Sequence, residues 1–504
     1  MERNVVEILE QAAVQYQDKV AVKDSEGQCT FRELCEDSKR IGSALSVYSL
    51  EGQTIPVYME KSILALKSFF GIVYSGGCYS LLNPIHPKER LEKILEVVQA
   101  PVVITDKGHV EALKQMKGVG TILLAEELVS SEVCEEKLLD IREKMIDTDA
   151  LYVNFTSGST GVPKGVVVGH KSVIEFMNDF VTLFQITDKD IIGNQAPFDF
   201  DVSVKDIYSM LLTGATMYII PKEAFLFPQR VLDILVREEV TTLIWAVSAL
   251  CMITSLKGFA YKVPSAVNKI LFSGEVMPIS HLQEWRSVLP QATFVNLYGP
   301  TEITCNCTYY VIKPGADVGD KLPIGKAFSN ERVFLLDEQD REICEPAIEG
   351  EICVAGSTLA LGYFRDRDKT DKAFVQNPLN DRYHELIYRT GDVAYYQPDG
   401  NMVYVGRKDF QIKHLGHRIE LLEIDAHMGS IPQIERVCCL YDEQKKKIVA
   451  CYQGDIDKAT IRTLLAEKVA KYMIPERFVR VEEMPLTSNG KIDRKKLAKE
   501  YLGK

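Results

Sequence analysis

One decapeptide constrains this chain more than any other stretch: residues 156–165, with the sequence TSGSTGVPKG. It follows an apolar run, residues 150–155, that predicts a buried strand. Its three glycines let backbone N–H groups approach a polyanion without a Cβ in the way, its hydroxyls add donors, and Lys164 adds a point charge. The decapeptide therefore suits a phosphate-binding loop, but its composition alone leaves an ordinary surface loop open, and its spacing is not Gly-x4-Gly-Lys-[Ser/Thr].

Length and composition are those of an ordinary globular protein. The 504 residues are 46% hydrophobic and 26% charged, and they suffice for several domains of about 150 residues each. The sequence has no apolar run of about 18 residues, and its charged N-terminus lacks the apolar core of a signal peptide. We therefore expect a cytoplasmic protein with no membrane span, and we expect it to be a monomer.

Cysteine spacing and charge argue against two further classes. The 12 cysteines are scattered, and their two close pairs, Cys305/Cys307 and Cys438/Cys439, lack the spacing of a zinc site. A net charge of −12 argues against nucleic-acid binding. The charge is uneven, because residues 410–504 carry a net charge of +4 and residues 1–409 carry −16. A basic C-terminal segment fits either a solvated surface or an acidic partner.

The first 150 residues alternate helical and strand-like patterns. Helical spacing of apolar residues is followed by short apolar runs that predict buried strands, at residues 20–22, 54–58, 102–105 and 121–124. Such alternation is typical of an α/β fold with a largely parallel sheet and helices on both faces.

Asp201 lies where a loop leads into a predicted helix. Residues 194–203 read NQAPFDFDVS, and the helix is expected over residues 204–212. A carboxylate at this place has two interpretations: it caps the helix N-terminus, or it binds a ligand. Position alone leaves both open.

Five further segments combine residue types that suit a nucleotide or its phosphates. Residues 270–276 read ILFSGEV, and residues 296–302 read NLYGPTE. Residues 388–392 read YRTGD, and residues 406–413 read GRKDFQIK. Near the C-terminus, residues 485–494 read PLTSNGKIDR. Each segment alone is compatible with a turn or a basic tail, so their order along one chain carries the information.

In that order, these segments resemble the motifs of the adenylate-forming superfamily over almost the whole chain. The likeness is greatest to amino-acid adenylation domains, and among them to stand-alone D-alanine–carrier protein ligases. The resemblance implies a large N-terminal domain (1–408) of layered α/β subdomains with a small β-barrel-like subdomain. It also implies a small mobile α+β C-terminal domain (409–504), with the hinge at Asp409.

The resemblance assigns ATP and Mg²⁺ as cofactors and gives the motif residues their roles. Tyr298 would stack on adenine, Asn296 would read its amino edge, and Asp392 would accept the ribose hydroxyls. Glu302 would hold Mg²⁺, and Lys491 would be the catalytic lysine. The implied nucleotide-binding residues are Thr156, Ser157, Gly158, Ser159, Thr160, Lys164, Gly274, Glu275, Val276, Asn296, Tyr298, Gly299, Thr301, Asp392 and Arg407.

The same resemblance implies an amino-acid substrate whose ammonium pairs with Asp201. Its pocket would be lined by Asp201, Val202, Lys205, Ile244, Leu271, Ser273, Leu297, Cys305 and Asn306. These mostly bulky apolar groups favour a small substrate, and D-alanine by overall likeness. Lys205 and Ser273 depart from the D-alanine ligases, which tend to have Met and Cys there. We expect Lys205 to extend toward water; if it points inward, an acidic or hydroxyl-bearing substrate would offset its cost.

The implied reaction has two steps. The amino-acid carboxylate attacks the α-phosphorus of ATP, and the aminoacyl group then passes to the phosphopantetheine thiol of a carrier protein. No carrier motif follows Lys491 before Lys504, so we expect a separate, acidic carrier. The alternatives are an acyl- or aryl-CoA ligase of the same superfamily, whose substrate offers Asp201 no ammonium, and a non-catalytic carrier-binding protein.

Overall fold

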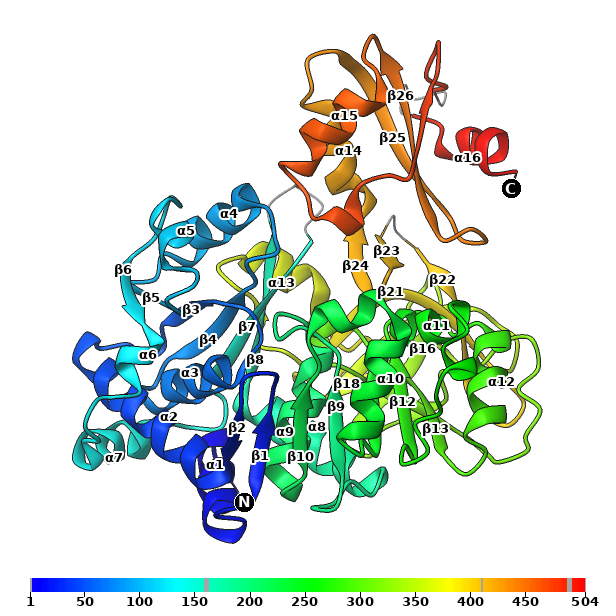
Figure 1. Ribbon diagram of the computed structural model, residues 1–504. Helices are drawn as coiled ribbons and strands as arrows, with labels where there is room; N and C mark the ends of the chain where they lie inside the picture. Colours follow the sequence, from blue (N-terminus) through cyan, green and yellow to red (C-terminus); the bar gives the residue numbers. More distant parts are fainter. Residues whose placement is uncertain (1, 158–162, 409–410, 487–491, 504) are drawn as a thin grey trace.

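The computed structural model describes residues 2–157, 163–408, 411–486 and 492–503. Figure 1 shows two large sheets with helices packed around them, a smaller sheet behind, and a C-terminal lobe at the top of the view in orange and red. The expected α/β class with layered subdomains and a small C-terminal α+β part is confirmed, although the parallel strands divide between two sheets.

The first large sheet has nine strands and a parallel centre. Parallel pairing runs from β13 through β12, β11, β9 and β10 to β1, while β2, β14 and β15 add antiparallel edges. In spatial order the strands are β15 (Lys326–Ala327), β14 (Thr308–Ile312), β13 (Thr293–Tyr298), β12 (Lys269–Ser273), β11 (Thr242–Ala246), β9 (Ile191–Asn194), β10 (Thr216–Ile219), β1 (Val20–Lys23) and β2 (Gln28–Thr30).

The second large sheet has seven strands and contains the phosphate-loop region. Strands β7, β4, β3, β5 and β6 are parallel, and β8 and β19 continue the sheet in antiparallel pairing. In spatial order the strands are β19 (Gly362–Tyr363), β8 (Lys164–Gly169), β7 (Ala150–Thr156), β4 (Cys78–Leu82), β3 (Thr54–Tyr58), β5 (Val102–Thr105) and β6 (Thr121–Leu124). Every residue of β3 and β4 is buried, as expected for parallel strands covered on both faces.

Thirteen helices within the described residues accompany these sheets (Figure 1). Local signals explain several boundaries: Thr30 and Glu33 form a capping box at the start of α2, and Pro228 occupies the first turn of α10. The helices are α1 (Val5–Gln15), α2 (Phe31–Leu45), α3 (Ile63–Tyr74), α4 (Lys88–Val98), α5 (Val110–Lys114), α6 (Ala125–Leu128), α7 (Glu135–Lys144), α8 (His170–Leu183), α9 (Val202–Thr213), α10 (Pro228–Arg237), α11 (Val247–Ser255), α12 (Ile279–Val288) and α13 (Arg367–Ala373).

A third, antiparallel sheet corresponds to the expected small β subdomain. Its long strand β21 pairs with β20 and β18 and, toward its end, with β22, so the sheet branches and curls there. Its strands are β17 (Glu342–Ile343), β16 (Glu331–Leu336), β18 (Gly350–Gly356), β21 (Leu386–Tyr396), β20 (Phe374–Gln376) and β22 (Met402–Arg407).

The C-terminal lobe has an apolar core of its own, with Ile424, Ile448 and Leu465 among its fully buried members. The lobe contains the hairpin β23–β24 (Gln411–His414 and His417–Glu420), the strands β25 (Ile434–Asp442), β26 (Lys447–Gly454) and β27 (Arg477–Arg480), and the helices α14 (Leu421–Gly429), α15 (Lys458–Ala466) and α16 (Arg494–Leu502). Across the described ranges, no helix has the length and apolar character needed to cross a membrane.

Candidate active site

The predicted nucleotide segments lie at the carboxyl ends of neighbouring parallel strands. Strand β12 ends at Ser273, where Gly274 turns the chain with φ +97°, and β13 ends at Tyr298. Phe272 and Asn296 are register partners, so the two ends meet. Open α/β sheets bind ligands at this edge. Of the 274–276 segment, Glu275 accepts the backbone N–H of Gly416 at 2.9 Å, whereas the Val276 side chain is 54% exposed.

Gly299 serves packing at this edge. A Cβ on Gly299 would lie 2.4 Å from Cα of Asn306, so only glycine lets the segment 305–306 pass so closely. Thr304 and Cys305 in that segment have positive φ, +53° and +77°, which for residues other than glycine requires support from the surroundings. Gly299 therefore helps to hold Cys305 and Asn306 beside the strand ends.

The strands flanking the predicted phosphate loop converge on the same region. Thr156 of β7 pairs with Lys164 of β8, and the Ser157 hydroxyl donates to the carbonyl oxygen of Arg418 at 2.8 Å. The predicted contacts Gly158, Ser159 and Thr160 lie outside the described residues. The loop region thus reaches the C-terminal hairpin through Ser157.

Glu302 is the centre of a buried charge cluster. Its side chain is fully buried; Nζ of Lys164 lies 3.3 Å from Oε1, Nη1 of Arg418 lies 2.5 Å from Oε2, and the Tyr363 hydroxyl donates to Oε1 at 2.7 Å. Burial alone would raise the pKa of Glu302, but the charges of Arg418 and Lys164 outweigh it and hold the pKa well below its ordinary value. Glu302 is therefore a carboxylate held ionised at neutral pH.

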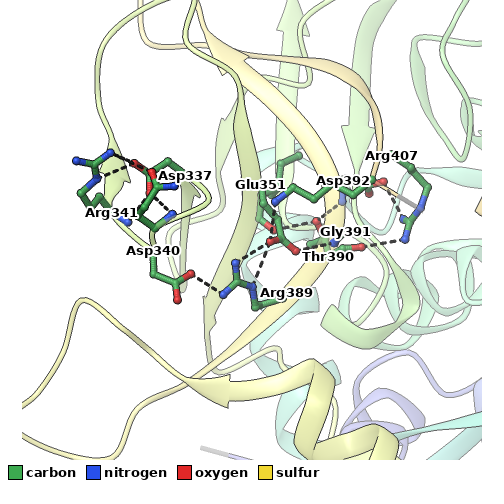
Figure 2. A network of polar contacts seen from close by, with 12 residues as sticks. Asp337, Asp340, Arg341, Glu351, Arg389, Thr390, Gly391, Asp392 and Arg407 are labelled. Carbon is green, nitrogen blue, oxygen red and sulfur yellow. Dashed lines mark hydrogen bonds and ion pairs between the residues drawn. The ribbon is translucent and has the colours of Figure 1, made fainter. Parts of the chain in front are cut away.

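Asp392 is the centre of a second cluster, seen in Figure 2. One carboxylate oxygen accepts from the Tyr298 hydroxyl at 2.5 Å, and the other lies 2.8 Å from Nη1 of Arg407. Tyr298 also has Nζ of Lys413 5.0 Å from its ring centroid, and Asn296 donates to the carbonyl oxygen of Pro323 at 2.8 Å. The predicted nucleotide residues Tyr298 and Arg407 thus both contact Asp392 directly.

Sequence reasoning missed Glu351, which supports that cluster from β18. Its Oε1 accepts the N–H of Gly391 at 3.1 Å, and its Oε2 accepts from Nη2 of Arg389 at 2.8 Å and from Nζ of Lys408 at 3.3 Å (Figure 2). The side chain of Glu351 is 8% exposed, and it fixes the backbone next to Asp392. Only the register of β18 against β21 brings Glu351 there, and no motif reveals that register.

The predicted pocket residues on α9 face the same strand ends. Asp201 occupies the N-cap position of α9, but its side chain makes no capping hydrogen bond, so the capping interpretation is wrong. Burial raises the pKa of Asp201, and this effect exceeds the opposing hydrogen bond from Thr301 and the charge of Lys205. Within the described residues, no basic side chain forms an ion pair with Asp201. The thiol of Cys305 donates to the Asp201 carbonyl oxygen at 3.0 Å.

Lys205 does not extend to water, which corrects the expectation drawn from the sequence. Its side chain is 0% exposed, and its Nζ lies 2.6 Å from Oδ1 of Asn306 and 3.3 Å from Oγ of Ser273. The reason is that α9 packs against α1, α8 and the strands β9, β10 and β11, so that residues 202–211 are all buried. The other predicted pocket residues, Val202, Ile244, Leu271 and Leu297, are buried too.

The C-terminal lobe touches the site through the hairpin β23–β24 and the residues around it. His417 stacks on Tyr472 at 3.6 Å between ring centroids and meets Phe200 edge-on at 5.3 Å. Arg90 of α4 lies 3.6 Å from Glu423 of α14, with both side chains buried. The predicted hinge Asp409 and catalytic Lys491 lie outside the described residues.

A pocket of about 880 Å³ opens between the N-terminal part and the lobe. Asp199 and His86, paired at 2.7 Å, lie on one side of it, and His417 and Tyr472 lie on the other. Asp199 is two residues before Asp201 in the sequence, but none of the predicted substrate residues lines this pocket. The part of the chain that the structure describes has no group of three or more His, Cys, Asp and Glu side chains able to hold a metal ion.

Comparisons with known proteins find relatives along nearly the whole chain. Zwittermicin A synthase ZmaJ of Bacillus cereus is 32% identical over 506 residues, covering 98% of this chain and 94% of that protein. Gramicidin S synthase 2 of Brevibacillus brevis is 32% identical over 488 residues; the match covers 95% of this chain but only 11% of that much longer protein.

Solved structures share the fold. Holo-PA1221, a nonribosomal peptide synthetase protein containing adenylation and carrier (PCP) domains, bound to a vinylsulfonamide inhibitor, superposes with a TM-score of 0.86. Its identity is 24%, over 99% of this chain and 84% of that one. The Vibrio cholerae adenylation domain AlmE, in complex with glycyl-adenosine-5′-phosphate, has a TM-score of 0.84 at 20% identity, over 100% of this chain and 98% of that one.

The fold is thus that of the adenylation domains. The model of the AMP-binding enzyme family matches residues 9–364. The chain belongs to the AMP-binding enzyme family.

Proposed function

We propose that this protein activates the carboxyl group of an α-amino acid with ATP, forming an aminoacyl-AMP and releasing pyrophosphate. The observation that carries the proposal is the Asp201 carboxylate, which makes no capping hydrogen bond and whose pKa is raised by burial. The ammonium group of an α-amino acid would pair with this buried carboxylate and offset the cost of its burial. A fatty or aryl acid has no ammonium group and could not do so. The matched peptide synthases from Bacillus and Brevibacillus support the same substrate class.

The nucleotide would lie along the strand ends. Adenine would stack on Tyr298, in the place that Lys413 now covers, and the ribose hydroxyls would donate to Asp392. The carboxylate oxygens of Asp392 already accept hydrogen bonds from the Tyr298 hydroxyl and the Arg407 guanidinium, so they are placed to accept from hydroxyl groups. Lys164 and the hydroxyls of the preceding loop, Ser159 and Thr160 included, would hold the phosphates.

Glu302 suits the Mg²⁺ ion of Mg·ATP. A buried, ionised carboxylate fits the ion, and one protein carboxylate suffices because Mg²⁺ in such sites takes its other ligands from phosphates and water. When bound, the ion would screen the phosphate charges. Arg418 now lies against Oε2 of Glu302, so the hairpin must withdraw this guanidinium before that oxygen can serve as a ligand.

In the first step a carboxylate oxygen of the amino acid bonds to the α-phosphorus, and the bond from this phosphorus to the pyrophosphate oxygen breaks. Two anions must meet, so cations at the reacting centre accelerate the step. We propose Lys491 for this role and Lys164 for the leaving pyrophosphate. The protein then acts by positioning and electrostatic stabilisation.

In the second step the thiol of a phosphopantetheine arm attacks the adenylate carbonyl and AMP leaves. The 880 Å³ pocket supports a route for such an arm, because it is lined by both parts of the chain and includes Asp199, two residues before Asp201. We propose that residues 409–504 form a mobile domain that rotates about Asp409 between the two steps. The net charge of +4 on residues 410–504 suits an acidic carrier supplied as a separate protein. A cytoplasmic location and a monomeric state remain predictions.

D-alanine remains one candidate substrate, supported by the apolar side chains of Ile244, Leu271 and Leu297 around the pocket. The buried Lys205 argues against D-alanine, because the methyl side chain of alanine has no acceptor or negative charge for the Lys205 ammonium group.

ATP–pyrophosphate exchange tests the proposal. Each amino acid of a panel is paired with the same acid lacking its α-amino group. We expect exchange with at least one amino acid, at least about 100-fold slower exchange with its deaminated partner, and a similar loss in Asp201→Ala. Exchange with a fatty or aryl acid and with no amino acid would contradict the proposal and assign the protein to the acyl- or aryl-CoA ligases.

A further inference from the structure

Lys205 is a buried cation that forms no ion pair with a carboxylate of the described residues. Its side chain is 0% exposed, and the acidic groups Cys305, Asp201 and Asp206 raise its pKa without outweighing burial. A buried ammonium is costly unless it is paired, and burial lowers the pKa of Lys205 accordingly. A lysine that only filled space would leave this cost uncompensated.

The neighbours of Lys205 orient its ammonium group and leave its charge unpaired. Two neutral oxygens, Oδ1 of Asn306 and Oγ of Ser273, accept two of its three N–H groups, at 2.6 and 3.3 Å. The adjacent Asp206 forms no ion pair with Lys205, and its Oδ2 accepts from Nδ2 of Asn194 at 2.6 Å. One N–H of Lys205 therefore has no protein acceptor among the described residues.

Asp201 and Lys205 stand one helical turn apart on α9, so their side chains share a face about 5–6 Å apart at Cβ. Asp201 is the proposed partner of the substrate ammonium, which places Lys205 one turn deeper, where the substrate side chain would lie. Cys305 and Asn306 line the same side, because the thiol of Cys305 donates to the backbone of Asp201 while Asn306 holds Lys205. Asp201 and Lys205 thus lie on one face of α9, and neither forms an ion pair with another side chain of the described residues.

Resting on the proposed function, we propose that the substrate is an acidic amino acid, whose side-chain carboxylate pairs with Lys205 while its α-ammonium pairs with Asp201. A carboxylate would supply the two things that Lys205 lacks: an acceptor for its remaining N–H group and a paired negative charge. The apolar groups Ile244, Leu271 and Leu297 are buried and bulky, which favours the short side chains of aspartate and glutamate over longer acids. An acidic substrate would replace D-alanine as the expected one.

Pyrophosphate exchange with isosteric pairs tests this assignment. Wild-type protein is assayed with both enantiomers of Asp, Asn, Glu, Gln and Ala. We expect kcat/KM for the preferred acid to exceed that for its amide by at least about 50-fold. A preference for Ala or for an amide over both acids would overturn the assignment to Lys205 while leaving amino-acid activation intact. Exchange with no α-amino acid would instead refute the proposed function.

Two lysine variants sharpen the test. Lys205→Met keeps the length but removes the charge, and it should lower kcat/KM for the acid by about 100-fold or more while narrowing the preference over the amide to within about fivefold. Lys262→Met makes the same change at a surface lysine paired with Asp233 and is the matched control. An acid preference that survives in a folded Lys205→Met protein would overturn the assignment. If Lys205→Met does not fold, the ratio of kcat/KM for the acid to that for its amide in the wild-type protein still tests the assignment.

Discussion

The contact between Arg418 and Glu302 gives a quantitative test of how the hairpin β23–β24 is docked. Nη1 of Arg418 lies 2.5 Å from a carboxylate that is fully buried, and only 13% of the Arg418 side chain is exposed. Arg418→Met removes the charge but keeps much of the length. Glu302 keeps Lys164 and the Tyr363 hydroxyl, so the cost is about 1.5–3 kcal/mol, the value of a hydrogen bond to a charged group. A buried charge left wholly unpaired would cost about 3–5 kcal/mol.

This cost falls on the docked arrangement of the lobe. The amide of Gly416 donates to Glu275 across the same junction, so its hydrogen exchange reports undocking. Peptides covering residues 411–420 should exchange about 10- to 150-fold faster in Arg418→Met, since 1.4 kcal/mol corresponds to about a factor of ten. Arg480→Met, which removes an exposed pair with Asp455, is the matched control and should change exchange by less than about twofold. Exchange that is equally slow in Arg418→Met and the control would refute this account of docking.

Three further predictions concern single side chains. The pKa of Glu302 is lowered from its ordinary 4.5, so the ionised side chain stabilises the folded state fully above that pH and progressively less below it. In urea unfolding, the free energy of unfolding of the wild type should fall by about 2 kcal/mol more than that of Glu302→Gln between about pH 6 and about pH 3. Equal falls in the two proteins would contradict this. Glu351→Gln should weaken ATP binding about tenfold in calorimetry, because Gly391 and Arg389 lose a charged acceptor; an unchanged Kd would exclude this supporting role. Gly299→Ala should lower the free energy of unfolding by about 1–3 kcal/mol, because its Cβ would lie 2.4 Å from Asn306; a urea midpoint equal to that of wild type would show that the backbone adjusts freely.

Short-range patterns predicted much of the fold. The apolar runs at residues 54–58, 102–105 and 121–124 are strands β3, β5 and β6 of one parallel sheet. The division of the parallel strands between two sheets could not be predicted, because it depends on pairing between distant segments: β1 joins β10 rather than β3. Hydrophobic periodicity identifies a strand but not its neighbour.

The site shows the same limit. Glu302 and Asp392 could be found because residue type and local motif point to them, and the structure gives both several charged or polar partners. Glu351 and Arg418 were missed because their roles arise from the register of β18 and from the docked hairpin. The prediction that Lys205 reaches water was wrong because a lysine on a helix usually extends to solvent, whereas residues 202–211 of α9 are all buried.

The measurement that tests the central claim most directly follows oxygen from substrate to nucleotide. The preferred amino acid, labelled with ¹⁸O at both oxygens of its α-carboxyl group, is incubated with Mg·ATP, and hydroxylamine captures the activated acyl group. If the carboxylate attacks the α-phosphorus, mass spectrometry will find one ¹⁸O atom in AMP and unlabelled pyrophosphate. Label in inorganic phosphate accompanied by ADP would mean attack at the γ-phosphorus, and it would contradict adenylate formation.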